Sequence, residues 1–136
     1  MTTFESKTES ISASSKDIFI KLSNLENLQE ITEKINDDRV KNIKLTPDTC
    51  YFHVDPIGEV GIKAIEKTEF KSIKFESDKS PVVFNIWIEL EEISSSQTNV
   101  KVILKADLPM MLKMMVSDPI NKFINILASS LTKISY

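Results

Sequence analysis

Four of the five methionines of this chain stand together in the stretch MMLKMMVSDP, residues 110–119. Methionine is unbranched and polarizable, so it adapts to irregular gaps and to partners of varied shape. Three uses of the cluster are open: a plug for the end of a core, a lid over an apolar cavity, or a surface that grips a partner helix. The third is the least favoured, because only Lys113 is basic in this segment.

Few other side chains have the types that acid–base or nucleophilic chemistry needs. His53 is the only histidine, and strand alternation places it with Tyr51 on the face opposite Phe52. Asp55 is its nearest possible partner, but that face is predicted to be solvated, which favours a surface histidine over a general base. Cys50 is predicted to point inward without a cationic neighbour, where it serves as a small apolar group rather than a nucleophile.

Glu66 is the one carboxylate that alternation would place inside, because it continues the face of Ile62 and Ala64. An inward carboxylate could orient a polar ligand or act as an acid with a raised pKa. A strand end or a single β-bulge would instead turn it to solvent, and we favour that placement. One cysteine and one histidine make no closed metal site, and two glycines cannot form a phosphate loop. We therefore expect no metal and no cofactor.

The composition is that of an acidic, single-domain protein. The 136 residues suffice for one core, and we expect one domain over residues 1–136. A net charge of -3 and a single arginine, Arg39, argue against nucleic acid as a partner. We expect neither a secretory signal nor a membrane span, which needs roughly 18–20 apolar residues. Because Cys50 is the only cysteine, no internal disulfide can form, which fits the cytoplasm.

The elements that position these residues are predicted to begin with a strand and two short helices. Residues 3–12 alternate loosely, which indicates a first strand. Ser14, three residues before Asp17, is placed to cap a helix. Apolar residues then recur at helical spacing up to residue 35, with a break at residues 24–27. Two helices with a bend between them explain this pattern.

From residue 40 the apolar period changes to two, which is typical of strands. Segments 40–46 and 49–54 flank Pro47 and Asp48 and predict a hairpin, with further turns at 55–58 and 78–81. In the strands predicted at 82–91 and 100–108, alternate residues form an apolar face, while Trp87, Lys101 and Lys105 lie opposite. Such strands predict an antiparallel meander with one buried and one solvated face.

A long C-terminal helix is predicted to cover the buried face. Asp118 can cap a helix that begins at Pro119, so residues 109–116 are expected to form a separate short segment. The helix over 119–134 has one apolar stripe, formed by Ile120, Phe123, Ile124, Leu127, Leu131 and Ile134. The order is strand, two helices, about six strands and a long helix. It predicts an α+β fold with a curved antiparallel sheet around the C-terminal helix.

This order resembles the helix-grip fold of the START-related, birch-pollen-allergen-like superfamily. Within it, the chain is similar to small bacterial proteins described as polyketide cyclase/dehydrase-like. The resemblance covers essentially the whole chain and is carried by SASSKDIFIKLSNLENL (12–28), DTCYFHVDPIGEVGIKAIEK (48–67) and LKADLPMMLKMMVSDPINKFINIL (104–127). It implies about seven strands around the helix and an apolar cavity between them. Some relatives are cyclases or hydratases, but no catalytic motif is common to the superfamily.

The leading hypothesis is a cytoplasmic module that binds a small apolar or amphipathic molecule between the sheet and the C-terminal helix, without a catalytic residue. The expected lining residues are Phe52, Ile62, Phe84, Ile86, Leu104, Met111, Met114, Met115, Phe123 and Leu127. One alternative is a cyclase- or hydratase-like enzyme that uses an inward polar group such as Glu66. Another is a cavity-less interaction protein that forms a homodimer through the sheet face around Trp87 or through the methionines.

Overall fold

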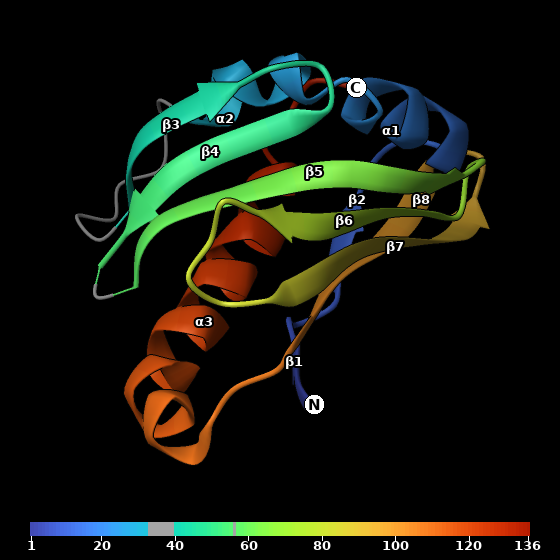
Figure 1. Cartoon of the computed structure of the whole chain (residues 1–136). Helices are drawn as coiled ribbons and strands as arrows, with labels where there is room; N and C mark the ends of the chain where they lie inside the picture. Colours follow the sequence, from blue (N-terminus) through green and yellow to red (C-terminus); the bar gives the residue numbers. More distant parts are fainter. Residues whose placement is uncertain (33–39, 56) are drawn as a thin grey trace.

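The computed structural model describes residues 1–32, 40–55 and 57–136, and Figure 1 shows a curved antiparallel sheet with a long helix under its concave face. The strands have the order β1-β8-β7-β6-β5-β4-β3, and β2 also pairs with β8. They are β1 (Thr2–Glu5), β2 (Glu9–Ile11), β3 (Val40–Leu45), β4 (Thr49–Val54), β5 (Gly58–Thr68), β6 (Ser72–Asp78), β7 (Phe84–Ser94) and β8 (Gln97–Ala106). The helices are α1 (Ser15–Leu22), the 3-10 helix η1 (Leu25–Leu28), α2 (Gln29–Thr32) and α3 (Met110–Leu131). The predicted α+β arrangement is confirmed.

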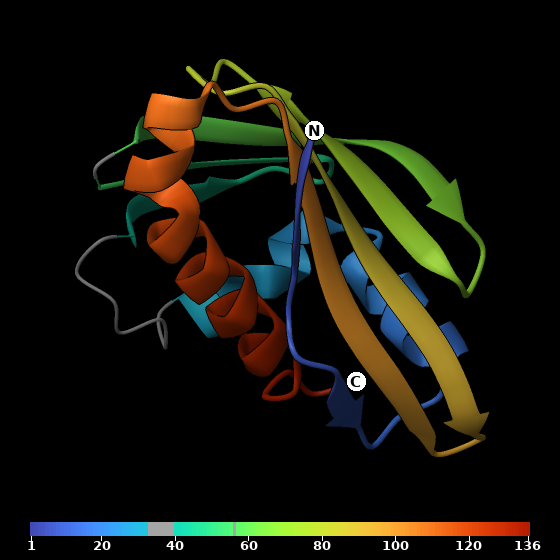
Figure 2. The same ribbon diagram turned by 90° about the horizontal axis from the view of Figure 1, so that it is seen from below.

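The N-terminal segment forms two strands, β1 and β2, where the sequence predicted one over residues 3–12. Ser6 interrupts the ladder, because its amide donates to the Val102 carbonyl at 2.8 Å while its hydroxyl accepts from the Val102 amide at 2.9 Å. The next amide, that of Lys7, donates to Asn125 Oδ1 of α3 at 2.8 Å. Figure 2 shows this segment running between α3 and β8. Contacts with residues distant in sequence therefore divide the strand.

The two-part helical region is confirmed within the described residues. Ser14 caps α1, since its hydroxyl accepts from the Asp17 amide at 3.1 Å. Asn24 caps η1 in the same way by accepting from the Glu26 amide at 3.0 Å. These caps satisfy amides that have no partner inside a helix, and they fix the bend at residues 24–27. The predicted continuation to residue 35 extends outside the described residues.

The central strands have the predicted register. Leu104 of β8 is 4% exposed on the concave face, whereas the adjacent Lys105 is exposed on the outer face. Trp87 of β7 is partly exposed on that outer face, as predicted, and the Nζ atoms of Lys74 and Lys105 lie 5.2 and 5.4 Å from its ring centroid. The sheet therefore buries one face and leaves the other solvated.

Helix α3 is continuous from Met110 to Leu131, so the predicted break at Asp118–Pro119 is wrong. Pro119 lacks an amide and its ring crowds the Met115 carbonyl, which favours a bend, and Figure 2 shows a single bent helix. Val116 and Ile120, on either side of Pro119, are both buried. Their burial offsets the loss of the hydrogen bond that an amide at position 119 would donate to the Met115 carbonyl. Consequently Asp118 is not a helix cap, and the helix ends at Leu131 rather than at residue 134.

None of the described helices is both long enough and apolar enough to cross a membrane.

Candidate ligand-binding cavities

Two small cavities lie between the concave face of the sheet and α3. The first has a volume of about 40 Å³ and is bounded by Val54 of β4 and Ile120 of α3, among others. The second has a volume of about 60 Å³ and is bounded on one side by Leu25 of η1. Among the described side chains that line them, none is charged, and Thr32 and Cys50, both at the second cavity, are the only polar ones. Such a lining selects apolar contents.

The stacked rings of Phe52 and Phe123 separate the two cavities. Their centroids are 5.1 Å apart and their planes differ by 18°. Both side chains, together with Ile86, line both cavities. Phe52 points inward because its neighbours in β4 alternate between the faces, and Phe123 lies on the apolar stripe of α3. The stack is therefore both a contact between sheet and helix and part of the boundary between the two spaces.

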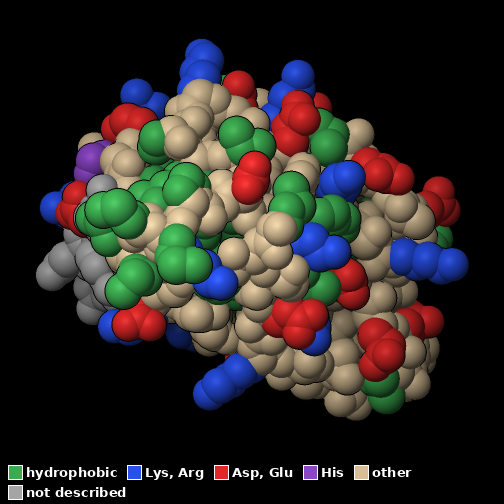
Figure 3. Space-filling model, turned by 60° about the horizontal axis from the view of Figure 1, so that its bottom comes forward, with side chains coloured by type: hydrophobic (Ala, Val, Ile, Leu, Met, Phe, Trp, Pro, Cys, Tyr) green, Lys and Arg blue, Asp and Glu red, His purple; other side chains and the backbone are tan. Residues whose placement is uncertain are grey.

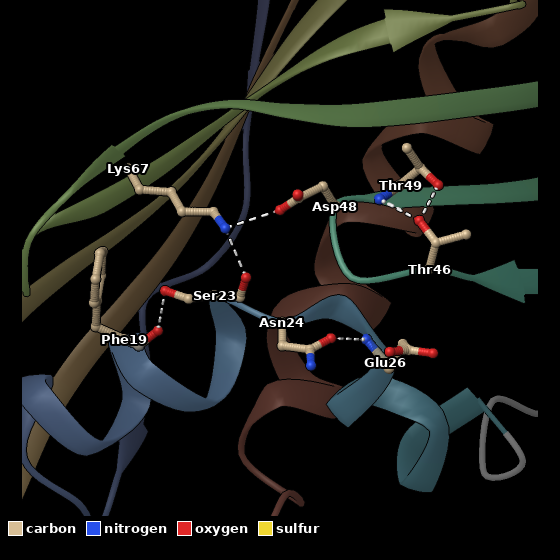
Figure 4. Close-up of polar contacts among 8 residues, drawn as sticks. All are labelled: Phe19, Ser23, Asn24, Glu26, Thr46, Asp48, Thr49 and Lys67. Carbon is tan, nitrogen blue, oxygen red and sulfur yellow. Dashed lines mark hydrogen bonds and ion pairs between the residues drawn. The ribbon is translucent and has the colours of Figure 1, made fainter.

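A polar cluster fixes the 3-10 helix that covers the second cavity (Figure 4). Lys67 of β5 donates to the Ser23 carbonyl at 2.7 Å and to Asp48 Oδ1 at 2.9 Å. The Leu25 amide donates to the Pro47 carbonyl at 2.9 Å. These bonds join the α1–η1 junction to β5 and to the turn between β3 and β4. Leu25 is thereby held over the cavity.

The volumes set a limit on what these two cavities can hold when the stack is closed. Sites for drug-sized molecules usually have about 300–1,000 Å³, and a benzene molecule fills an apolar cavity of about 150 Å³. Each of the two cavities is smaller than that. The two spaces together are still smaller than that, so a ligand of one aromatic ring requires that Phe52 or Phe123 itself moves aside.

No known protein-family model matches the chain, and no curated protein matches it in sequence. Solved structures match it in shape. Norcoclaurine synthase from Thalictrum flavum, in complex with dopamine and hydroxybenzaldehyde, has a TM-score of 0.73 at 13% identity, covering 97% of this chain and 84% of that chain. A START superfamily protein from Mycobacterium smegmatis has a TM-score of 0.63 at 14% identity, covering 98% and 99%. An uncharacterised protein from Bacillus thuringiensis has a TM-score of 0.60 at 11% identity, covering 96% and 98%.

The chain has the START-like helix-grip fold. The resemblance inferred from the sequence is confirmed at this level, and at identities this low the likeness shows the fold alone. In this helix-grip fold the two cavities lie where the sheet curves around α3. The Phe52–Phe123 stack joins the sheet to α3 between the two cavities.

Seven of the ten expected lining residues border the helix-grip cavities. Phe52, Ile86 and Phe123 border both cavities. The other four border one cavity each, Phe84 and Leu104 the first, and Ile62 and Leu127 the second. Alternation in the strands and helical spacing in α3 were sufficient to find them. Whether these positions bind a ligand stays a prediction.

Met111, Met114 and Met115 are not at either cavity, so the predicted lid over a cavity is wrong. Together with Met110 they are 62–81% exposed on the outer side of α3. Because residues 110–116 belong to the continuous helix α3, their inward positions are taken by Leu112 and Val116. Figure 3 shows hydrophobic side chains gathered on this part of the surface. They do not plug the core either.

The sequence analysis did not identify several residues that line the two cavities. Ile57 follows β4 and borders the first cavity together with Pro119, which had been assigned to a helix start. Leu25 and Ile43 border the second cavity from η1 and β3. The burial of Leu25 was available from the sequence, because it stands three residues after the apolar Leu22. Its place at the cavity was not, because it depends on how η1 folds back over the sheet.

The titratable side chains singled out from the sequence either lie outside the two cavities or are poorly reactive. Glu66 is exposed, because the pairing of β5 with β6 shifts between Ala64 and Glu66. The favoured solvated placement is confirmed, and the enzyme alternative loses its acid. His53 Nε2 donates to Asp55 Oδ1 at 2.8 Å and its Nδ1 lies 3.5 Å from Glu59 Oε1, on the outer face.

Cys50 borders the second cavity, and burial raises the pKa of its thiol to about 12. A thiol with this pKa stays protonated at neutral pH and is a poor nucleophile, as the sequence suggested. Within residues 1–32, 40–55 and 57–136, no group of three His, Cys, Asp or Glu side chains is arranged to hold a metal ion.

Proposed function

We propose that this protein binds a small, uncharged, apolar or weakly amphipathic molecule between the sheet and α3. The observation that carries the proposal is the Phe52–Phe123 stack, which divides an uncharged apolar interior into two spaces. Opening the stack costs the contact between the rings, worth about 0.5–1.5 kcal/mol beyond area burial. A ligand ring that takes the place of one phenyl ring restores that contact.

The size of the interior favours molecules built on one aromatic ring or of similar bulk. Each cavity is smaller than the apolar cavity of about 150 Å³ that holds benzene, and the rings of Phe52 and Phe123 border both. Norcoclaurine synthase, which shares the fold, was solved with dopamine and hydroxybenzaldehyde, both single-ring compounds. Thr32 and Cys50 offer the polar atoms available to a ligand with one polar end.

The proposal can be tested with toluene, indole and 4-hydroxybenzaldehyde as probes. Titration of each, followed by methyl NMR, should shift the resonances of Ile86, which borders both cavities. Phe123→Ala removes the partition and should bind toluene at least about tenfold more tightly, because the enlarged cavity no longer requires opening. Phe19→Ala is the matched control, since Phe19 packs edge-on against Phe70 and lines neither cavity.

Two results would count against the proposal. If none of the probes shifts the Ile86 methyl groups in the wild-type protein or in Phe123→Ala, the interior is only a core. If Phe19→Ala increases toluene binding as much as Phe123→Ala, the probe is entering a generally loosened protein rather than these cavities.

A further inference from the structure

Six of the nine exposed large hydrophobic side chains among the described residues come to one end of the molecule. Four of them are Met110, Met111, Met114 and Met115, here called the methionine patch, on the outer side of the first two turns of α3. Figure 3 shows that hydrophobic side chains gather over this part of the molecule.

The pairing of the strands gives the positions of the remaining two side chains, Val83 and Met1. Ala106 at the end of β8 pairs with Phe84 on one side and Thr2 on the other. One residue further along, Val83 and Met1 therefore flank the chain where it leaves β8 for α3. The Asp107 amide donates to the Val83 carbonyl at 3.1 Å. Val83 and Met1 are 66% and 80% exposed, and they lie beside the segment that leads to α3 rather than within the methionine patch.

The area of the methionine patch is that of an interface. Four methionines exposed to this degree present roughly 600 Å² of apolar surface, which is the upper end for the largest patch on a typical monomer. Two such surfaces together bury roughly 1,200 Å², which is the lower end of the range for specific interfaces. Methionine suits such a contact because its flexible side chain repacks against another of its kind.

The charges around the methionine patch of one copy are complementary to those around the same patch of a second copy. Helix α3 begins at Met110 with no side-chain cap and no acidic residue in its first turn, so its N-terminus carries a partial positive charge that no side chain within the helix start offsets. Asp118 is exposed and lies seven residues, or two turns, after Met111 on the same side of the helix. If two α3 helices lie antiparallel and cross near Met114, each Asp118 comes beside the other helix's first turn at Met110.

We propose that the methionine patch is a homodimer interface, in which the first two turns of α3 pack antiparallel against the same turns of a second copy. A two-fold axis passes near Met114, so the same surface serves both copies. The methionines fill the centre of the contact, and the reciprocal pairing of Asp118 with the helix start fixes its direction. Only Lys113 is charged between residues 108 and 117, so few like charges meet. The proposal is independent of ligand binding, because the methionine patch borders neither cavity.

Sedimentation velocity over about 1–500 µM tests the association. The wild-type protein should pass from monomer to dimer in this range. Met111→Gln combined with Met114→Gln keeps length and helix propensity but makes the surface polar, and should raise the dimer dissociation constant at least about a hundredfold. Ile20→Gln combined with Ile93→Gln changes two exposed hydrophobic side chains elsewhere and should leave it unchanged. Circular dichroism checks that both variants are folded.

Cysteine cross-linking tests the direction of packing. Met114→Cys should form a reducible dimer on mild oxidation, because the two copies of residue 114 meet at the axis. Met110→Cys should not, because antiparallel helices hold its two copies about 12 Å apart, beyond the reach of a disulfide. The wild-type protein controls for Cys50. Asp118→Lys should weaken the dimer at least about tenfold at low salt.

Four outcomes would overturn the proposal. One is a wild-type protein that stays monomeric at 500 µM. Another is a dimer unaffected by the methionine substitutions, and the third is cross-linking of Met110→Cys as efficient as that of Met114→Cys, which indicates parallel packing. A monomer that binds phosphatidylcholine vesicles through the same methionines overturns it as well, and assigns the methionine patch to a lipid surface.

Discussion

Gly61 lies beneath the aromatic ring of Tyr51, its partner across β4 and β5. A Cβ atom at position 61 would be 2.6 Å from Tyr51 Cδ1 and 2.3 Å from the Asp78 carbonyl oxygen. The Tyr51 hydroxyl donates to Asp78 Oδ2 at 2.5 Å, so the ring is held at both ends. This close approach explains why the strand position is glycine.

Gly61→Ala should therefore destabilise the protein by about 2 kcal/mol, although alanine is ordinarily the better strand residue. The added methyl group must displace the ring and the β6 backbone. Urea unfolding measures the change. Lys63→Ala, on an exposed position of the same strand, should change the free energy of unfolding by less than about 0.5 kcal/mol. Equal losses in the two variants would contradict the geometry at Gly61.

Leu104→Asp should abolish or severely weaken the fold. Leu104 pairs with Phe4 and Ile86 at the centre of the concave face, where an unpaired carboxylate costs several kcal/mol whether it is charged or forced neutral. Lys105→Asp, one residue along on the outer face, should cost less than about 1 kcal/mol. Thermal melts compare the two, and matching melting temperatures would show that the assigned faces are wrong.

Stability above pH 9 should depend on Cys50. Burial raises the pKa of its thiol from 9.0 to about 12, so the unfolded chain releases this proton before the native protein does. Stability then falls as the pH rises from 9 towards 12, by at most about 1.4 kcal/mol per pH unit. Urea unfolding at pH 8 and pH 10.5 should show a smaller loss for Cys50→Ala than for the wild-type protein. An identical loss in both would mean that the native thiol is already ionised.

Trp87 should be quenched more strongly by iodide than by caesium. It is partly exposed, and the ammonium groups of Lys74 and Lys105 lie over its ring, where they attract anions and repel cations. Replacement of both lysines by glutamate should reverse the order. Indole fluorescence that resists both quenchers would show that this face of the sheet is covered.

The polar cluster at Lys67 should control access to the second cavity. Lys67→Met removes both bonds to the Ser23 carbonyl and Asp48, which loosens η1 over the cavity. Because the site is exposed, the global stability should change by less than about 1 kcal/mol. The reaction of Cys50 with a thiol reagent should nevertheless become at least about threefold faster, since opening η1 exposes it. Lys63→Met should leave this rate unchanged.

Local patterns were sufficient for much of the fold. The alternation through β7 and β8 placed Leu104 and Trp87 on their correct faces, and Ser14 marked a helix start that the structure confirms. These features depend on neighbours in sequence. The same patterns also located most of the side chains between sheet and helix.

The sequence predictions failed where contacts between residues distant in sequence determine the structure. Pro119 predicts a helix boundary locally, but burial of Val116 and Ile120 against the sheet keeps α3 intact. The methionine spacing is compatible with either side of a helix, and only the docking of α3 shows which side is outward. The partition of the interior depends on the orientation of the Phe123 ring, which no spacing of residues determines.

The pairing of β1 and β2 with β8 has a consequence for how the chain acquires its structure. Ser6 bonds with Val102, and Lys7 bonds with Asn125, so the first strands find their partners only among the last third of the residues. During synthesis the N-terminal segment cannot form these native contacts until β8 and α3 have left the ribosome. Contacts between such distant residues slow folding, because a long loop must close before they form. The hairpins from β3 to β8 can form earlier, and the N-terminal strands then complete the edge of the sheet last.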